Sequence, residues 1–156
     1  TVITILTADC LPILFYQPRT QCIAACHAGW RGALDGIIDS TVLAMEALGG
    51  GRGSIKAVIG PCIAQNSYQV EFGFLDQFAE RDPTFVQYFI NDDKTHLRFD
   101  LSGFIELMIK RSGILFSENI DHDNCTATET FFSYRRTKLA GSNDYGRSIS
   151  AIALRN

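Results

Sequence analysis

The clearest fold signal lies in residues 1–32, TVITILTADCLPILFYQPRTQCIAACHAGWRG. Three runs in it are rich in β-branched, aromatic and other apolar side chains, and they predict strands over Thr1–Asp9, Pro12–Gln17 and Gln21–Cys26. Only Pro18-Arg19-Thr20 separates the last two runs, and a connection this short favours antiparallel pairing. The chain therefore begins with strands that follow one another directly.

Downstream, the apolar side chains recur at helical spacing. Gly29–Leu48 predicts an amphipathic helix that ends at the glycines of residues 49–51, because glycine adopts the left-handed conformation without a Cβ penalty. Three further helices are predicted, over Glu71–Glu80, over Thr84–Ile90, and from Asp100 or Ser102 to Gly113. Four further strands are predicted, over Ile55–Ile59, Ile114–Ile120, Phe131–Tyr134 and Ser148–Leu154. Strands thus precede and follow a helical middle, which predicts an α+β fold with mixed sheets rather than a doubly wound parallel sheet.

Length and composition restrict the class of protein. The 156 residues are 46% hydrophobic and 20% charged, which predicts one compact domain over residues 1–156 and excludes intrinsic disorder. The net charge of -3 argues against nucleic acid as a partner, and no apolar stretch of about 20 residues predicts a membrane span. Because the first residues already read as a strand, without a leader, we expect the N-terminal part of the domain to be absent from this sequence.

The five cysteines indicate the compartment. Their odd number, without any CxxC pair, predicts free thiols in a reducing environment, and hence a cytoplasmic protein. Neither of the two glycine-rich nucleotide-binding fingerprints occurs, which argues against nucleotide binding by those routes.

Two local clusters contain candidate functional residues: Thr7-Ala8-Asp9-Cys10, and Cys26 to Gly32 at the junction of a strand with the long predicted helix. A helix N-terminus near Gly29 favours anions, and Arg31 would lie in its first turn with a guanidinium suited to phosphate. Cys10 and His27 are 17 residues apart, across one hairpin. They could form a thiolate–imidazolium nucleophile or supply two ligands of a metal such as zinc, and buried structural roles are the third alternative.

Other candidates have weaker signals. His122-x-x-Cys125 has metal-like spacing in a polar loop, and His96 lies among charged residues and is interpreted as solvated. Arg135-Arg136 is either an anion clamp or a polar strand end.

A set of short motifs in fixed order resembles the YfiH-type laccase-domain family, once called multicopper polyphenol oxidases and now regarded as purine nucleoside phosphorylases. The motifs extend over the whole chain: TADCLP (7–12), HAGWRG (27–32), GPCI (60–63) followed by YQV (68–70), DL (100–101), CT (125–126), FFSYRR (131–136) and GR (146–147). The resemblance implies mixed sheets layered with helices. It also implies cytoplasmic enzymes that cleave adenosine, inosine, guanosine and methylthioadenosine with phosphate and that deaminate adenosine.

The resemblance further implies a metal site of one cysteine and two histidines. Cys10 and His27 match the cysteine and the second histidine, with zinc as the expected metal and copper as the alternative. The first histidine belongs to a Val-His-Gly segment that this sequence does not contain, and neither His96 nor His122 matches it.

The resulting hypothesis assigns a role to each candidate. Zinc on Cys10 and His27 would polarise water for deamination, with Asp9 as a proton shuttle or as an orienter of the ligands. Phosphate would be held near Gly29 and by Arg31, with help from Arg135 or its neighbour Arg136.

Three alternatives remain open in the sequence. One is a metal-independent hydrolase with a Cys10–His27 pair, and another is an interaction module that is inactive because the third metal ligand is missing. A copper oxidase is a poorer alternative, because the chain lacks the ligands of a multicopper cluster. Cys62 in the GPCI motif is interpreted as structural.

Overall fold

The centre of the computed structural model, which describes residues 1–155, is a four-stranded sheet. Its strand order is β3 (Cys22–Ala28), β2 (Leu11–Gln17), β4 (Lys56–Ile59) and β8 (Phe116–Asn119). β2 is antiparallel to both of its neighbours, whereas β4 and β8 are parallel. The predicted hairpin of β2 and β3 is therefore confirmed, and the sheet is mixed.

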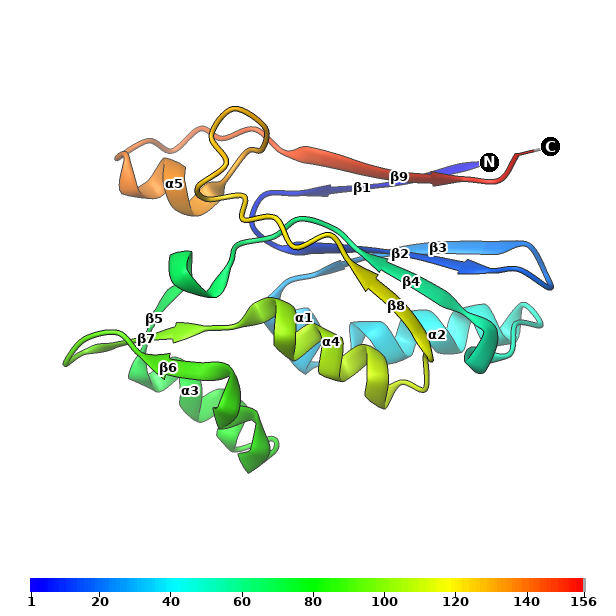
Figure 1. Ribbon diagram of the computed structural model, residues 1–156, viewed down its shortest axis with the longest axis horizontal. Coiled ribbons are helices and arrows are strands. Elements are labelled where there is room, and N and C mark those ends of the chain that lie inside the picture. The colour runs from blue at the N-terminus through cyan, green and yellow to red at the C-terminus, as the bar shows by residue number, and fades with distance from the viewer. Residues whose placement is uncertain (156) are drawn as a thin grey trace.

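A two-stranded sheet lies over one face of this central sheet (Figure 1). It pairs β1 (Val2–Thr7) with β9 (Ser148–Ala153) in an antiparallel register that runs from Val2 opposite Ala153 to Thr7 opposite Ser148. Both strands agree with the sequence-based predictions. Their pairing brings the two ends of the described chain side by side, as Figure 1 shows.

Helices α1 (Trp30–Leu34), α2 (Ile37–Ala47) and α4 (Leu101–Arg111) lie on the other face of the central sheet (Figure 1). Alternate residues of β2, including Ile13 and Phe15, are fully buried on this side because successive strand side chains point to opposite faces. The helices contribute Val42, Phe104 and Ile105 to the same core. Sheets of mixed direction layered with helices confirm the predicted α+β class.

A third unit extends from one end of these layers. It consists of a three-stranded antiparallel sheet, in the order β5 (Gln69–Glu71), β7 (His96–Phe99) and β6 (Phe89–Asn91), together with α3 (Phe72–Ala79) and a 3-10 helix, η3 (Pro83–Tyr88). Packed aromatic rings hold it to α4; the ring centroids of Phe78 and Phe104, for example, are 5.1 Å apart. Two further 3-10 helices, η1 (Arg52–Ser54) and η2 (Gln65–Ser67), lie in connecting segments.

Three sequence-based predictions of secondary structure are wrong. The continuous helix over Gly29–Leu48 is divided into α1 and α2, because Gly36 adopts a left-handed φ of 90° between them. The segment Phe131–Tyr134 is not a strand; the Ser133 side chain accepts a hydrogen bond from Arg136 N and caps α5 (Tyr134–Leu139). The segment Thr84–Ile90 divides between η3 and β6.

The remaining helices agree with the predictions to within a few residues. Asp100 caps α4, since its side chain accepts a hydrogen bond from Gly103 N at 2.9 Å. Within residues 1–155, no helix has the length and apolar character needed to cross a membrane.

Candidate functional site

The corner between β1 and β2 places the TADC motif at the edge of two sheets. β1 ends at Thr7, and the chain turns through residues 8–10 before β2 begins at Leu11. Asp9 adopts a left-handed φ of 78°, which is uncommon for a residue other than glycine and is tolerated best by Asn and Asp. Only 8% of Asp9 is exposed, so the turn carries a buried carboxylate.

A cavity of about 230 Å³ opens beside this corner. Its wall combines aromatic rings with a thiol, a carboxylate and a guanidinium; the residues that matter for the chemistry are Asp9, Cys10, Trp30, Tyr68, Tyr134 and Arg135. We call it the Asp9 cavity. Burial raises the pKa of Tyr68 to about 12, so its hydroxyl stays neutral and remains a hydrogen-bond donor.

Asp9 and Arg135 are brought together although they are 126 residues apart in the chain. The backbone N–H of Arg135, in the first turn of α5, donates to Oδ2 of Asp9 at 2.6 Å. Oδ1 of Asp9 is buried and has no hydrogen-bond partner among residues 1–155. The Arg135 guanidinium lies 5.5 Å from the centre of the Tyr68 ring.

Arg136 differs from Arg135 in its contacts. Its guanidinium donates to the backbone carbonyls of Asn124, Cys125 and Phe131 at 2.7, 3.1 and 2.6 Å. Those bonds hold the loop before α5 in place. Of the two adjacent arginines, only Arg135 therefore faces the Asp9 cavity.

Cys10 is half-buried, and its thiol packs against the backbone of Gly29. A Cβ added at Gly29 would lie 3.0 Å from Sγ of Cys10, closer than nearly all Cβ contacts, so only glycine leaves the thiol in this position. Burial, and then the negative charge of Asp9, raise the pKa of the Cys10 thiol above its ordinary value. In the absence of another charge, the thiol is neutral near pH 7.

His27 lies at the same end of the hairpin as Cys10 but does not line the Asp9 cavity. The register sets His27 opposite Pro12, and Leu11 opposite Ala28. Because side chains alternate along β3, Cys26 and Ala28 are buried in the core while His27 points to the opposite face and is exposed. The two residues predicted to bind one metal are thus neighbours across the hairpin, with only the thiol in the cavity wall.

Gly29 and Arg31 lie at a helix N-terminus that is weaker than predicted. Gly29 is the N-cap residue of α1, but α1 has five residues rather than the twenty expected from the sequence. A single short turn has fewer aligned peptide dipoles, so it attracts an anion less than a long helix would. Arg31 is exposed, and its guanidinium lies 4.9 Å from the centre of the Trp30 ring.

The donor set for a metal is incomplete within the described residues. Residues 1–155 contain no group of three or more His, Cys, Asp or Glu side chains arranged to hold an ion. Cys10 and His27 could supply a thiolate and an imidazole, the donors that zinc prefers, but a catalytic zinc site normally has three protein ligands. His122 and Cys125 do not form such a group either, and the carbonyl of His122 accepts a hydrogen bond from Cys62 N at 3.2 Å.

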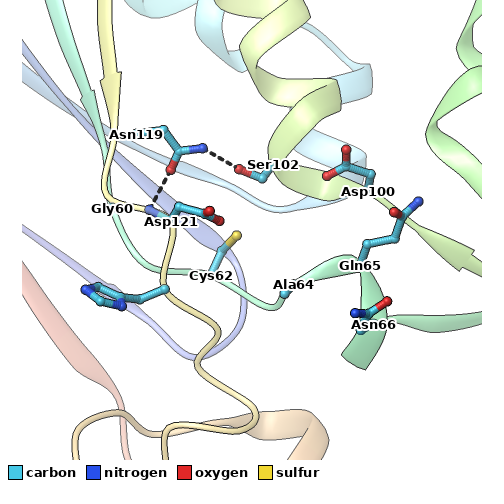
Figure 2. Close-up of a pocket in the computed structure, with 10 residues that line it drawn as sticks. Gly60, Cys62, Ala64, Gln65, Asn66, Asp100, Ser102, Asn119 and Asp121 are labelled. Atoms are coloured by element: carbon cyan, nitrogen blue, oxygen red, sulfur yellow. Dashed lines mark hydrogen bonds between the residues drawn. The ribbon is translucent and has the colours of Figure 1, made fainter.

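A second cavity, of about 250 Å³, lies where the parallel strands β4 and β8 end and α4 begins. Figure 2 shows the polar side chains around it, which come from the segment after β4, from the start of α4 and from the end of β8; they include Cys62, Gln65, Asp100, Ser102, Asn119 and Asp121. We call it the Asp100 cavity. Cys62 and Ala64 line this cavity whereas Ile63 lines the Asp9 cavity, so the segment 62–64 separates the two.

Sequence reasoning did not select Trp30, Tyr68 or Tyr134 as site residues. Each of the three lies in one of the motifs HAGWRG, YQV and FFSYRR. Their position in these motifs is the sequence signal that could have identified them. Their rings come from α1, from the end of η2 and from α5, and only the fold brings them together around one cavity.

Comparison with known proteins identifies the family. The sequence model described as "Multi-copper polyphenol oxidoreductase laccase" matches residues 1–155. The chain belongs to this family. The resemblance inferred from the motifs is thereby confirmed.

Two curated relatives are named purine nucleoside phosphorylases. One, from Rickettsia prowazekii, is 37% identical over 155 residues, which are 99% of this chain and 64% of the relative. The other, YfiH from Escherichia coli, is 34% identical over 143 residues, which are 90% of this chain and 56% of the relative. The chain thus spans less than two thirds of the length of either relative.

Two solved structures show the same fold as this laccase-family chain. A Neisseria meningitidis protein described by the family model DUF152 superposes with a TM-score of 0.84 at 31% identity, covering 96% of this chain and 59% of that one. A Bacillus licheniformis hypothetical protein YfiH superposes with a TM-score of 0.88 at 28% identity, covering 99% of this chain and 58% of that one.

Proposed function

We propose that this chain carries the active site of a purine nucleoside phosphorylase. The substrates would be adenosine, inosine, guanosine and methylthioadenosine, cleaved with phosphate, and adenosine would also be deaminated. The names of the relatives support the reaction class. The observation that carries the proposal is the Asp9 cavity, which combines Cys10 and Asp9 with Arg135 and three aromatic rings.

The cavity wall suits both parts of a phosphorolysis. Aromatic rings such as Trp30 and Tyr68 offer faces on which a purine packs, and the guanidinium of Arg135 is suited to phosphate. Arg31, whose guanidinium lies beside the Trp30 ring, is a second phosphate candidate, and the N–H groups that follow Gly29 are a third. A phosphate oxygen would attack the anomeric carbon of the ribose. The glycosidic C–N bond then breaks, and the purine leaves with the bonding electrons and takes up a proton.

Cys10 and His27 are the proposed metal ligands, with zinc as the first candidate and copper as the second. When bound, zinc lowers the pKa of a coordinated water, which is the chemistry that deamination at C6 of the purine needs. Cys10 and His27 would be two of the three protein ligands usual for such a site. Two roles remain to this chain's own residues: Cys10 presents sulfur at the cavity wall, and Gly29 leaves room for it.

One observation disfavours a metal-independent cysteine hydrolase. The raised pKa of Cys10 leaves the thiol neutral, whereas a cysteine nucleophile needs a lowered pKa. The five free cysteines, in turn, support a cytoplasmic location.

The test measures ribose 1-phosphate released from inosine and phosphate by the wild-type chain and by Cys10→Ala and His27→Ala. We expect both variants to lose at least about 10²-fold in kcat/KM, the effect typical of removing a group that acts in the transition state. Cys125→Ala, at a partly exposed thiol outside the Asp9 cavity, is the matched control and should keep wild-type activity.

The same experiment separates the alternatives. Wild-type turnover by both variants would show that the site is assigned wrongly, and no turnover by the wild-type chain would favour the interaction module. Elemental analysis of the purified chain distinguishes the two Cys10 chemistries. Stoichiometric zinc that is lost in Cys10→Ala supports metal ligation, whereas activity that is unaffected by a chelator supports the hydrolase.

A further inference from the structure

We propose that Asp9 contacts the substrate directly, through Oδ1, by accepting a hydrogen bond from the 2′- or 3′-hydroxyl of the ribose. This inference rests on the proposed function, because it takes a nucleoside as the ligand of the Asp9 cavity. It gives Asp9 a different role from the proton shuttle or ligand orienter that the sequence suggested.

The two carboxylate oxygens of Asp9 have different surroundings. Oδ2 accepts the backbone N–H of Arg135 at 2.6 Å, a bond that fixes the plane and direction of the carboxylate. Oδ1 is buried and has no partner among the described residues, and the side chain lines the cavity. A buried acceptor without a donor is unfavourable, so a ligand that brings an O–H or N–H to Oδ1 removes that penalty.

Asp9 is part of the wall of the cavity. Asp9 is 8% exposed and lies next to Cys10 in the cavity wall. The neighbouring Arg135 guanidinium is directed to the ring of Tyr68, 5.5 Å from its centre. The unpaired oxygen is therefore left to a ligand donor.

The proposed substrates select the hydroxyls as that donor. The four nucleosides differ at the purine edge, where the donors of adenosine and inosine occur at different positions. Methylthioadenosine also lacks a 5′-hydroxyl. The donors that all four share are the 2′- and 3′-hydroxyls, and a fixed buried acceptor serves all four only if it meets a shared group. Carboxylates that bind ribose hydroxyls are a recurrent feature of nucleotide-binding sites.

Asp9→Asn tests the inference with almost no change of shape. The amide oxygen of the variant must stay on the Arg135 N–H, because an NH₂ group there would set two donors against each other. The NH₂ group then replaces Oδ1 and turns the free acceptor into a donor. Asp76→Asn, at an exposed carboxylate of α3, is the matched control.

The measurement is the dissociation constant, by titration calorimetry without phosphate, of inosine, 2′-deoxyinosine and 3′-deoxyinosine. We expect wild type and Asp76→Asn to bind inosine at least tenfold more tightly than one of the two deoxy analogues. In Asp9→Asn the NH₂ group can only donate to the hydroxyl oxygen, and this neutral bond is weaker than one to a carboxylate, so the preference for inosine over that analogue should fall at least threefold.

The outcomes separate this inference from the proposed function. Equal binding of all three nucleosides by the wild-type chain overturns the role of Asp9 but leaves the proposed function standing, and this arm needs no variant. A preference for inosine that is undiminished in a folded Asp9→Asn also overturns it. If the wild-type chain binds none of the three nucleosides, both the inference and the proposed function are wrong.

Discussion

The Asp9 cavity and the Asp100 cavity lie on opposite sides of the segment 62–64 and have similar volumes, about 230 and about 250 Å³. Their polar groups are satisfied in different ways. In the Asp100 cavity three of the polar side chains are bonded to protein groups: Asn119 Nδ2 donates to Ser102 Oγ at 2.8 Å, Asn119 Oδ1 accepts from Asp121 N at 2.9 Å, and Asp100 accepts from Gly103 N at 2.9 Å. In the Asp9 cavity a buried carboxylate oxygen has no partner.

This difference indicates separate roles for two cavities of similar volume. The bonds around the Asp100 cavity cap α4 and connect the end of β8 to this helix, which gives Asp100, Ser102 and Asn119 structural roles. The Asp9 cavity differs, because the unpaired carboxylate oxygen of Asp9, the aromatic rings and the Cys10 thiol have no such structural role. Whether the buried polar atoms have hydrogen-bond partners therefore distinguishes a ligand site from a structural cavity better than the volume of the cavity does. Three predictions test this distinction.

The largest effect concerns the thiols. Burial, followed by the nearby carboxylates, raises the pKa of Cys62 to about 12. Relative to an ordinary cysteine pKa of about 8.5, this lowers its thiolate fraction at pH 8 by about 10³-fold. We expect iodoacetamide to leave Cys62 unmodified in the native protein while Cys125, partly exposed, is alkylated. Peptide mapping by mass spectrometry measures this; rapid labelling of native Cys62 would show that the Asp100 cavity holds a reactive thiol.

A smaller effect is expected from crowding the Cys10 thiol. In Gly29→Ala the new Cβ would lie 3.0 Å from Sγ, so the sulfur must move away from its position in the cavity wall. The required shift is a few tenths of an ångström, less than the displacement of about 1 Å that lowers activity by about 10²-fold, so we expect kcat/KM for inosine to fall by about three- to tenfold. Gly51→Ala, where no atom lies within 4 Å of the new Cβ, is the control. Equal activity of the two variants would contradict a role for this thiol.

The smallest effect concerns Asp100. Burial, and then the charges of Glu106 and Asp121, raise the pKa of its carboxyl. A carboxyl whose pKa is higher in the folded state holds its proton longer there. Its contribution to the free energy of unfolding therefore decreases as the pH rises from the ordinary Asp value of about 3.9 through the raised pKa.

Asp100→Asn has no ionisable group at this position, so the free energy of unfolding no longer decreases with pH there, and its amide oxygen can still cap α4 by accepting from Gly103 N. At pH 7 we therefore expect its free energy of unfolding to equal or slightly exceed that of wild type. Asp100→Ala removes the cap and should lose about 1 kcal/mol. Urea unfolding at pH 4 and pH 7 measures both. Neither variant should change kcat/KM for inosine more than twofold, and a larger loss in Asp100→Asn would assign the second cavity to the reaction.

Much of the fold could be predicted from local patterns. The strands of residues 1–32 and β9 have runs of β-branched residues long enough to recognise, and the glycines at 49–51 and 113 lie where helices end. The strands β5, β6 and β7 were missed because three or four residues are too few to show a period of two. The break at Gly36 was missed because the apolar spacing continues across it, although Asp-Gly is a turn signal.

The candidate site likewise contains residues that local sequence patterns identified and residues that only the fold brought to it. The TADC and HAGWRG motifs identified Asp9, Cys10 and His27 as chemically capable residues. That His27 points away from the core follows from the extension of β3 to Ala28, which the sequence-based prediction ended at Cys26. Nothing in the local sequence placed Tyr68 or Arg135 beside them. Those contacts form because β1 pairs with β9 at opposite ends of the chain and α5 follows the loop that Arg136 holds.

The amino-acid sequence alone determined which segments become strands and helices and which side chains can do chemistry, because both depend on near neighbours in the chain. Tertiary structure alone decided that one oxygen of Asp9 is bonded and the other free, since the donor lies 126 residues away. It also decided that the Asp9 cavity, and not the Asp100 cavity, has a lining residue with a buried oxygen that lacks a hydrogen-bond partner. The arrangement of partners around a buried group is a property of packing, which no local pattern of residues contains.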